Sequence, residues 1–356
     1  MKVVNKNRET NIELLRILAL LGVIVLHYNG YVGHALELVA PRSMNYYVLS
    51  FLECVCACAV DLFVLISGYF LSQKDYTGWK KPVKLILEVI LIKEVFYFVQ
   101  VYKGEMDLNL HHLFGNALPN NYFAIYYCVL YMLAPYLNRV IRNANEKEQR
   151  RFLGLILLFF SICPTIYDMM SAVLGKVIPG LSTISNSGSD AGYTIVNFIM
   201  MYFVGAYCRA LEGKWSKKIL ITALLISWMF LFLWYCFGDI VNSDHVALEY
   251  CNPVIVLCAA VLFLLFKKIK VKGDRKIAII SFLAMDGFTV FLLHERFLPM
   301  FNVEEYIVKN PGISTLHLIV TCFATYLLCM PFAFLYEYLW RIIVNGCAQL
   351  IKMIRQ

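Results

Sequence analysis

Charged residues are scarce in this sequence of 356 residues: Asp, Glu, Lys and Arg supply only 16% of it, whereas hydrophobic residues supply 60%. A soluble domain carries charges at about a quarter of its positions, and these keep its surface in water. The sequence also lacks a linker rich in Pro, Gly or Ser, a low-complexity tract and an internal repeat. These absences argue against a soluble, multi-domain protein and favour one integral membrane domain over residues 1–356, with lipid around much of its surface.

Several familiar motifs are missing as well. There is no Walker loop, no dinucleotide-binding fingerprint and no Gly-x-Ser-x-Gly elbow, so the sequence gives no sign of those enzyme classes. Most of the 12 cysteines lie within apolar runs, where they are expected to be small apolar filler without a disulfide framework. The loop histidines, including the adjacent pair at positions 111 and 112, lack the spacing of a metal site, and we expect no metal.

Ten apolar runs account for most of the chain and predict an all-α bundle of about ten transmembrane helices. Several runs are shorter than the roughly 20 residues that a crossing needs, so the helices should extend into the flanking segments. The runs cover residues 12–28, 48–71, 83–102, 122–137, 152–170, 193–207, 219–237, 253–266, 277–294 and 316–340.

Lysine and arginine are distributed unevenly between the loops that join the runs. With Lys84 counted at the edge of the second loop, 25 of the 32 lie in the even-numbered loops and the two terminal segments. The odd-numbered loops carry only five of them: Arg42, Lys103, Lys176, Arg296 and Lys309. Because translocating basic residues is unfavourable, this pattern predicts that the basic segments and both termini are cytoplasmic. The same location of the charges argues against nucleic acid as the partner of this chain of net charge +8.

The first run carries Arg16 and His27 at a depth where a charge is costly unless it is paired or meets water. Eleven residues come within about 20° of three helical turns, so both side chains are expected on one face, about 16 Å apart along the axis. A snorkelling anchor at Arg16 and a hydrogen-bonded core histidine at His27 are the structural alternatives. Glu13 and Arg16 interrupt the start of the apolar stretch, which favours a retained span over a cleaved signal peptide.

Later runs contain further ionisable residues that are candidates for function or for packing: Asp61, Lys93, Glu94, Asp286 and His294. Lys93 and Glu94 are neighbours and do not face each other on a helix, so they need partners on other helices. Asp61 and Asp286 are the candidates for Lys93. Ion pairs that only fix the packing are the alternative to direct chemistry.

The fourth run is rich in tyrosine. Its five tyrosines extend too far along a helix for an interfacial belt to explain all of them, so some are expected to pack in the core or to line a sugar path: Tyr122, Tyr126, Tyr127, Tyr131 and Tyr136.

Five segments, in order along the chain, resemble the membrane-bound acyltransferase family 3. The stretch NIELLRILALLGVIVLHY matches the hallmark of arginine, ten residues and histidine, at Arg16 and His27. VDLFVLISGYFLS resembles the segment ending in Ser-Gly-Tyr/Phe, at Ser67 and Gly68. YFAIYYCVLYMLAPYLNRVI, MYFVGAYC and GFTVFLLHERF resemble later elements, the last ending in Leu-x-x-His at His294. The ordered set covers nearly the whole chain.

This resemblance implies transfer of an acyl group, usually acetyl, from cytoplasmic acyl-CoA to a hydroxyl of an extracytoplasmic or lipid-linked polysaccharide. Acetyl-CoA would be a donor substrate, with no permanently bound cofactor. Arg16 would hold the donor, with Ser67 and Gly68 also assigned to its binding, and His27 would be the general base or a transient acyl carrier. Lys93 or backbone amides would stabilise the oxyanion. The expected location is the plasma (inner) membrane of a bacterium, with polysaccharide-assembly proteins as candidate partners.

Two other functions fit the same buried charges. A transporter or flippase would move a glycan precursor without covalent chemistry, and broken helices in two related halves would favour it. The sequence shows no such symmetry. A structural subunit of an assembly complex would tolerate loss of both Arg16 and His27.

Overall fold

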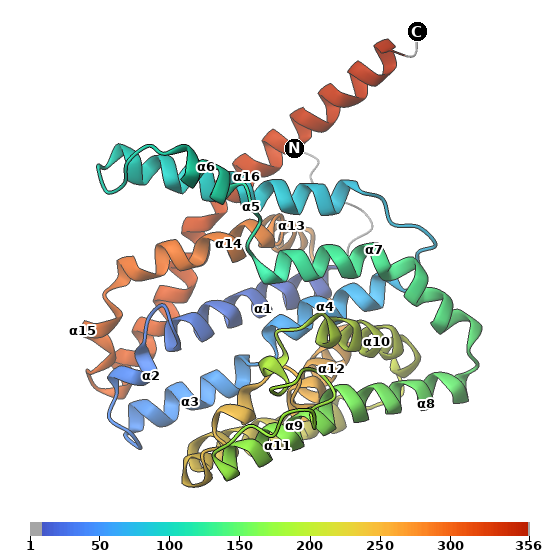
Figure 1. Ribbon diagram of the computed structural model, residues 1–356, viewed down its shortest axis with the longest axis vertical. Coiled ribbons are helices and arrows are strands. Elements are labelled where there is room, and N and C mark those ends of the chain that lie inside the picture. The colour runs from blue at the N-terminus through green and yellow to red at the C-terminus, as the bar shows by residue number, and fades with distance from the viewer. Residues whose placement is uncertain (1–8, 355–356) are drawn as a thin grey trace.

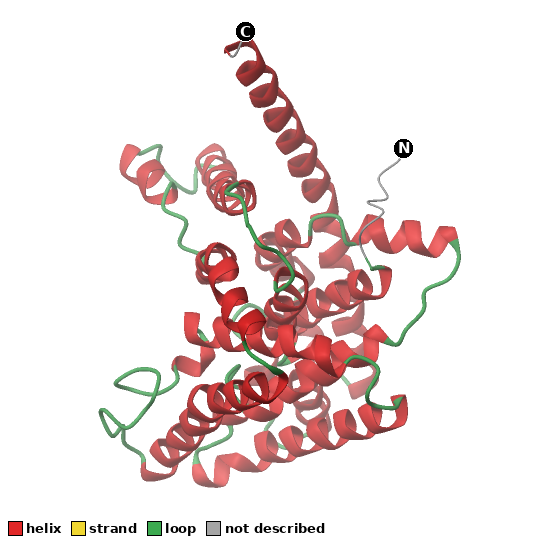
Figure 2. Ribbon diagram, turned by 90° about the vertical axis from the view of Figure 1, so that its right-hand side faces the viewer, coloured by secondary structure: helices red, strands yellow, loops and turns green. Residues whose placement is uncertain are grey.

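The computed structural model describes residues 9–354, and every regular element in that part of the chain is helical (Figures 1 and 2). The predicted all-α class is therefore confirmed. The α-helices are α1 (Thr10–Asn29), α2 (Ala35–Leu38), α3 (Met44–Cys56), α4 (Ala59–Leu71), α5 (Lys80–Tyr102), α6 (Leu110–Asn116), α7 (Tyr122–Asn143), α8 (Glu146–Leu157), α9 (Cys163–Leu174), α10 (Ile195–Leu211), α11 (Lys217–Phe237), α12 (Pro253–Lys267), α13 (Asp274–Leu283), α14 (Gly287–Phe297), α15 (Val303–Ile307) and α16 (Pro311–Ile354).

Each of the ten predicted runs falls on one helix or on two successive helices. Seven helical segments are long and apolar enough to cross a membrane, and the bent pair α13–α14 makes an eighth if it is one span. The other two runs differ, because α5 carries Glu88, Lys93 and Glu94 within its apolar stretch and α10 has only 17 residues. The chain is thus a multi-pass membrane protein, and the count of ten crossings stays a prediction.

Side-chain caps set where many of these helices begin. A hydroxyl or amide oxygen just before the helix accepts a hydrogen bond from a backbone N–H of the first turn, which would otherwise have no partner. At α8 the cap is reciprocal, because Glu148 also accepts from the backbone of Asn145. The capping residues are Ser43, Asn109, Asn121, Asn145, Thr194, Ser216 and Asn252.

Polar contacts gather the loops at two ends of the bundle. Ion pairs join the even-numbered loops at one end, which we call the basic end: Arg142 with Asp75, Lys214 with Glu146, and Lys267 with Glu212. Contacts join odd-numbered loops at the opposite end: Arg42 with Asp239, and Asn45 with the carbonyls of Ile307 and Lys309. The structure therefore separates the loops as the charge pattern predicts. Which end faces the cytoplasm stays a prediction, and the basic residues Lys2, Lys6 and Arg8 lie outside the described residues.

Three runs that the sequence presents as single helices are interrupted. The run 48–71 divides into α3 and α4, and the run 152–170 contains a π-helical segment over Leu158–Ile162. The run 277–294 bends by 60° between α13 and α14. At that bend Asp286 has φ −141° and ψ 74°, and its carboxylate accepts a hydrogen bond from Lys84 of α5. A short polar side chain that bonds outside its own helix favours such an ending, which periodicity alone does not reveal.

Helices α4 and α10 pack with their backbones in close contact. A Cβ atom added at Gly68 would lie 2.2 Å from the carbonyl oxygen of Tyr202, and one added at Gly205 would lie 2.0 Å from that of Leu65. Small residues of this kind let membrane helices approach closely and gain dispersion energy. The resemblance assigns Gly68 to donor binding, and the structure places it in this helix contact.

We predict that Gly68→Ala destabilises the protein by about 1–3 kcal/mol, because the added methyl group meets backbone rather than a movable side chain. Thermal unfolding in detergent measures the effect. Gly154→Ala is the matched control, since a Cβ at this helical glycine has nothing within 4 Å, and it should be neutral or stabilising by up to about 1 kcal/mol. Equal melting temperatures for the two variants would contradict the prediction.

Candidate active site

A cavity of about 250 Å³ lies between α1, α4, α5, α7, α14 and α16. Three cations reach it, Arg16 from α1 and Lys81 and Lys84 from the start of α5. Arg16 pairs with Glu13 at 2.5 Å and has a third of its side chain exposed. Lys81 is an exposed residue. The cavity therefore opens among cations near the basic end, as a site for an anionic ligand would.

Lys84 holds the bend between α13 and α14 in place. Its Nζ lies 2.8 Å from a carboxylate oxygen of Asp286 and 2.8 Å from one of Glu337 on α16. Nearby, Glu88 is fully buried and accepts a hydrogen bond from the hydroxyl of Thr289. One ammonium group thus offsets two carboxylates on two other helices, in a region where unpaired charges are costly.

A hydrogen-bonded chain of polar groups lines the cavity. Lys81 Nζ donates to the hydroxyl of Tyr127 at 2.5 Å, and that hydroxyl lies 3.1 Å from Ser67 Oγ. Ser67 in turn donates to the carbonyl of Phe63 at 2.9 Å. Because the hydroxyl hydrogen of Ser67 is used in this bond, the Tyr127 hydroxyl donates to Ser67 Oγ. Each hydroxyl hydrogen in the series then has an acceptor. Ser67 thus lies in the cavity wall, where the resemblance expects a donor-binding residue.

His27 lies three turns from Arg16 on α1, in a second polar cluster. Its Nδ1 is 2.9 Å from His294 Nε2 and 3.4 Å from Glu295 Oε1, both on α14. Tyr31 donates its hydroxyl hydrogen to Glu295. His294 is fully buried and 18% of the His27 side chain is exposed. The hydrogen between the two rings is carried by one of these two nitrogens, and a proton on His27 Nδ1 would leave His27 Nε2 with a lone pair.

The side chains of His27, His294 and Glu295 also offer ligand atoms within 4.8 Å of one another, a set that could hold a metal ion. The sequence, in contrast, predicts no metal site. Two imidazole nitrogens on one tetrahedral zinc ion lie about 3.3 Å apart. The 2.9 Å separation between His27 and His294 is instead that of a hydrogen bond. The hydrogen-bonded cluster therefore fits the geometry better.

The cavity and the histidine pair are adjacent but separate. Arg16 lines the cavity and His27 does not. Phe291 links the two, because it lines the cavity and its ring centre is 5.9 Å from that of His294, which bonds His27. Arg16 therefore lies at the cavity, and His27 is connected to its lining through His294.

The expected pairing of Lys93 with Asp61 or Asp286 is wrong. Lys93 Nζ donates to the carbonyl of Leu118 at 2.8 Å, because this part of α5 faces the loop before α7. Asp61 is buried and accepts from the amide of Asn197 at 3.1 Å. Asp286 pairs with Lys84, as described. Lys93 and Glu94 do not line the cavity, and neither does Asp61.

Sequence reasoning did not single out four residues of these two clusters. Lys84 was counted with the basic loop, although its spacing of four residues from Glu88 places both on one helical face. Lys81 carried no signal beyond that loop, and Tyr127 was one of five tyrosines. Glu295 follows His294 directly, so its carboxylate could have been noted in the same motif.

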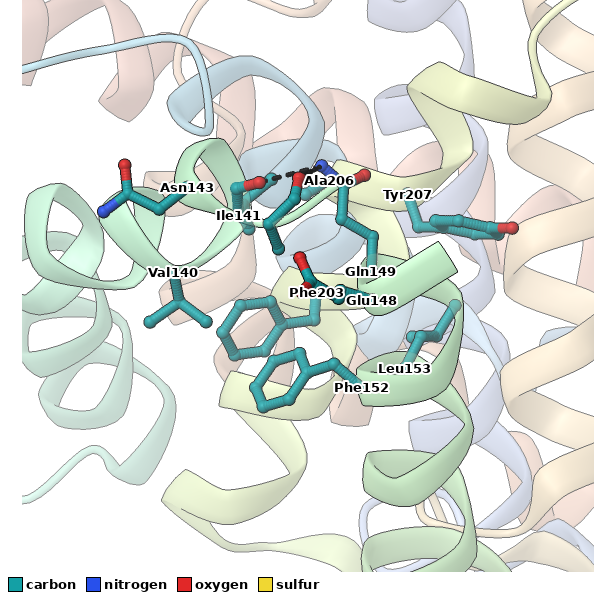
Figure 3. A pocket seen from close by; sticks show the side chains of 11 residues that line it. Val140, Ile141, Asn143, Glu148, Gln149, Phe152, Leu153, Phe203, Ala206 and Tyr207 are labelled. Atoms are coloured by element: carbon teal, nitrogen blue, oxygen red, sulfur yellow. Dashed lines mark hydrogen bonds between the residues drawn. The ribbon is translucent and has the colours of Figure 1, made fainter. Parts of the chain in front are cut away.

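A larger hollow of about 330 Å³ lies elsewhere, where the ends of α7 and α8 meet α10 (Figure 3). Its wall is mostly apolar, with the rings of Phe152 and Phe203 5.0 Å apart. The side-chain amide of Gln149 is engaged with the carbonyls of Ile141 and Ala144. Its lining contains no histidine, lysine or arginine. This hollow therefore offers little for acyl-transfer chemistry.

Comparison with known proteins agrees with the motifs. A family model described as an acyltransferase domain matches residues 9–334, which is most of the chain. The protein therefore belongs to acyltransferase family 3. Comparisons with curated proteins and with solved structures gave no match. Together with the apolar helices, the family defines the protein as a membrane acyltransferase.

We predict that Lys84→Met destabilises the protein by about 3 kcal/mol, because it removes the cation that pairs with the buried Asp286 carboxylate and leaves Glu337 with Arg341, at 3.1 Å, as its cationic partner. Lys84→Arg should recover part of the loss. Lys103→Met is the control, since Lys103 and its partner Glu105 are more than half exposed and 3.7 Å apart, and it should change stability by less than about 0.5 kcal/mol. The unfolding temperature in detergent compares the three, and a wild-type value for Lys84→Met would refute the assignment.

Proposed function

We propose that the protein is a membrane O-acyltransferase that moves an acetyl or similar short acyl group from cytoplasmic acyl-CoA to a hydroxyl of an extracytoplasmic or lipid-linked polysaccharide. Its place would be the plasma (inner) membrane of a bacterium. The observation that carries the proposal is the pairing of two sites. A cavity lined by Arg16, Lys81 and Lys84 lies where α5 begins, and Phe291 of its lining contacts His294, the hydrogen-bond partner of His27.

The cations near the mouth suit the donor. CoA carries phosphates that do not cross a membrane, whereas its acyl group is small. Arg16 and Lys81 would bind phosphate or pantetheine oxygens through charge-assisted hydrogen bonds. Lys81 has a phenol, rather than a carboxylate, as its hydrogen-bond partner in the described part of the chain, which leaves its charge available to an anion.

The histidine cluster suits the acceptor. His27 Nε2 would take the proton of the acceptor hydroxyl while the oxygen attacks the thioester carbonyl. The C–S bond breaks, an ester C–O bond forms, and the proton finally passes to the CoA thiolate. If His27 first carries the acyl group, the same bonds are exchanged in two steps. In either route the Glu295 carboxylate, 3.4 Å from His27 Nδ1, would stabilise the imidazolium or acyl-imidazolium.

One observation favours the transporter alternative. The bent pair α13–α14 is broken at Asp286 beside a half-buried Lys84, and carriers bind their substrates at such breaks. A carrier would move a glycan precursor without releasing CoA from acyl-CoA.

Incubating membrane vesicles that contain the protein with acetyl-CoA labelled in the acetyl group separates the two functions. The proposal expects free CoA thiol and labelled glycan in equal amounts. Movement of glycan with no thiol release would establish the carrier, and neither product would refute both.

We predict that His27→Ala lowers the rate of acyl transfer by 10²-fold or more, since a general base contributes about 10²–10⁴-fold. His34→Ala is the control, because half of the His34 side chain is exposed and it pairs with the exposed Glu37, and its rate should be that of the wild type. Equal amounts of folded protein are checked by fluorescence-detected gel filtration. A His27→Ala variant with normal transfer would remove His27 from the mechanism.

We predict that Lys81→Met raises the KM for acyl-CoA about 10- to 100-fold, which corresponds to one charged hydrogen bond of about 1.5–3 kcal/mol. Lys80→Met controls for general surface charge, since Lys80 is exposed and does not line the cavity. Initial rates at varied acetyl-CoA give the two KM values. An unchanged KM for Lys81→Met would place the donor elsewhere.

A further inference from the structure

The cavity has one cationic end and one aromatic end. Its cations lie near the basic end, where α5 begins and where Lys81 is exposed. Chain direction places the aromatic residues farther in. Phe63 lies one turn before Ser67 on α4, which runs toward the basic end, and Phe123 lies at the start of α7, which runs the same way. Phe291 lies on α14, which runs from the bend at Asp286 toward the opposite end.

The aromatic rings form a continuous wall at the inner end. The ring centre of Phe123 is 5.2 Å from that of Phe291 and 6.3 Å from that of Phe63, while Phe288 stacks on Phe291 at 6.0 Å. These are distances of packed aromatic pairs. On the far side of the wall, Phe291 lies against His294, which bonds His27. Phe291 is thus the member of the wall that also touches the histidine pair.

An acyl-CoA donor held by Arg16 and Lys81 would point its acyl group at this wall. The end of the acyl chain would then meet Phe63, Phe123, Phe288 and Phe291, of which Phe291 contacts His294, the hydrogen-bond partner of His27. Protein interiors are packed closely enough that even one additional methylene group is felt. A small acyl group needs a small displacement of the ring, and each further methylene group needs a larger one.

We infer that Phe291 determines specificity for acyl chain length: it admits short acyl groups to His27 and holds back longer ones. This inference rests on the proposed acyltransferase function. It adds a position, Phe291, that selects the donor by size and takes no part in proton transfer.

Donors of two, four, six and eight acyl carbons test the inference in membrane vesicles from producing cells, with each CoA ester labelled in its acyl group. The quantity compared is kcat/KM for hexanoyl-CoA divided by kcat/KM for acetyl-CoA. One methylene group in a fitted apolar pocket changes discrimination by about 10- to 200-fold. Phe291→Ala should therefore raise the ratio at least about 10-fold, and Phe291→Leu, which keeps more of the apolar volume, should raise it less.

Two control variants distinguish the effect of a larger cavity from the effect of removing the Phe291 ring. Phe288→Ala enlarges the same cavity but keeps the Phe291 ring beside His294. It should therefore change the ratio less than about threefold, well below the increase expected for Phe291→Ala. Phe282→Ala removes a half-exposed ring that packs on Phe334 outside the cavity, and it should leave the ratio unchanged. If Phe288→Ala raised the ratio as much as Phe291→Ala, cavity volume alone would set chain length and the inference would be overturned.

The outcomes for the inference and for the function are distinguishable. Wild-type vesicles that release no CoA from any donor would refute the acyltransferase function. Wild-type vesicles that transfer acetyl groups, combined with a Phe291→Leu variant that is folded and has the wild-type ratio, would overturn the role of Phe291 alone.

Discussion

Pairing of charge in a poorly hydrated interior is the constraint on which the rest of the structure depends. Lys84 of α5 bonds carboxylates of α14 and α16 at once, so three helices far apart in the sequence share one ammonium group. Without this contact Asp286 would be a carboxylate at the free end of a broken helix, inside the bundle. Because the bond is formed, the chain can bend by 60° there and still bury the site.

That bend positions both halves of the candidate active site. On its basic-end side Met285, Asp286 and Gly287 contribute to the cavity wall, and about two turns farther along α14 His294 and Glu295 meet His27. A straight helix over the same residues would place the cavity residues and the pair His294–Glu295 in different positions relative to α1. The polar cavity and the histidine pair are therefore placed by one irregular helix against a regular one, α1.

Much of this arrangement could be predicted from the sequence, for clear physical reasons. Long apolar runs require helices in lipid, and the alternation of lysine and arginine separates the loops into the two groups that the ion pairs confirm. Arg16 and His27 stood out because charge is costly at such depth. The sequence does not show which residues pair across helices. Lys84 therefore groups with the loop lysines, and Lys93 resembles a buried cation although it faces a loop. Sequence periodicity reports which face of a helix is apolar, but not which helix lies opposite. The bend at Asp286 was equally hidden, since a polar residue within an apolar run also fits an intact helix.

The last helix has two structural roles. At 1.5 Å per residue, the 44 residues of α16 extend about 66 Å, twice the hydrocarbon thickness of about 30 Å, and its C-terminal portion projects from the bundle (Figure 1). Pro331 interrupts the hydrogen bonding inside this rod, and Glu337 lies two turns beyond it. The same helix carries Glu337, which pairs with Lys84 at 2.8 Å. One helix therefore both projects from the bundle and supplies one of the two carboxylates that hold Lys84 beside the bend at Asp286.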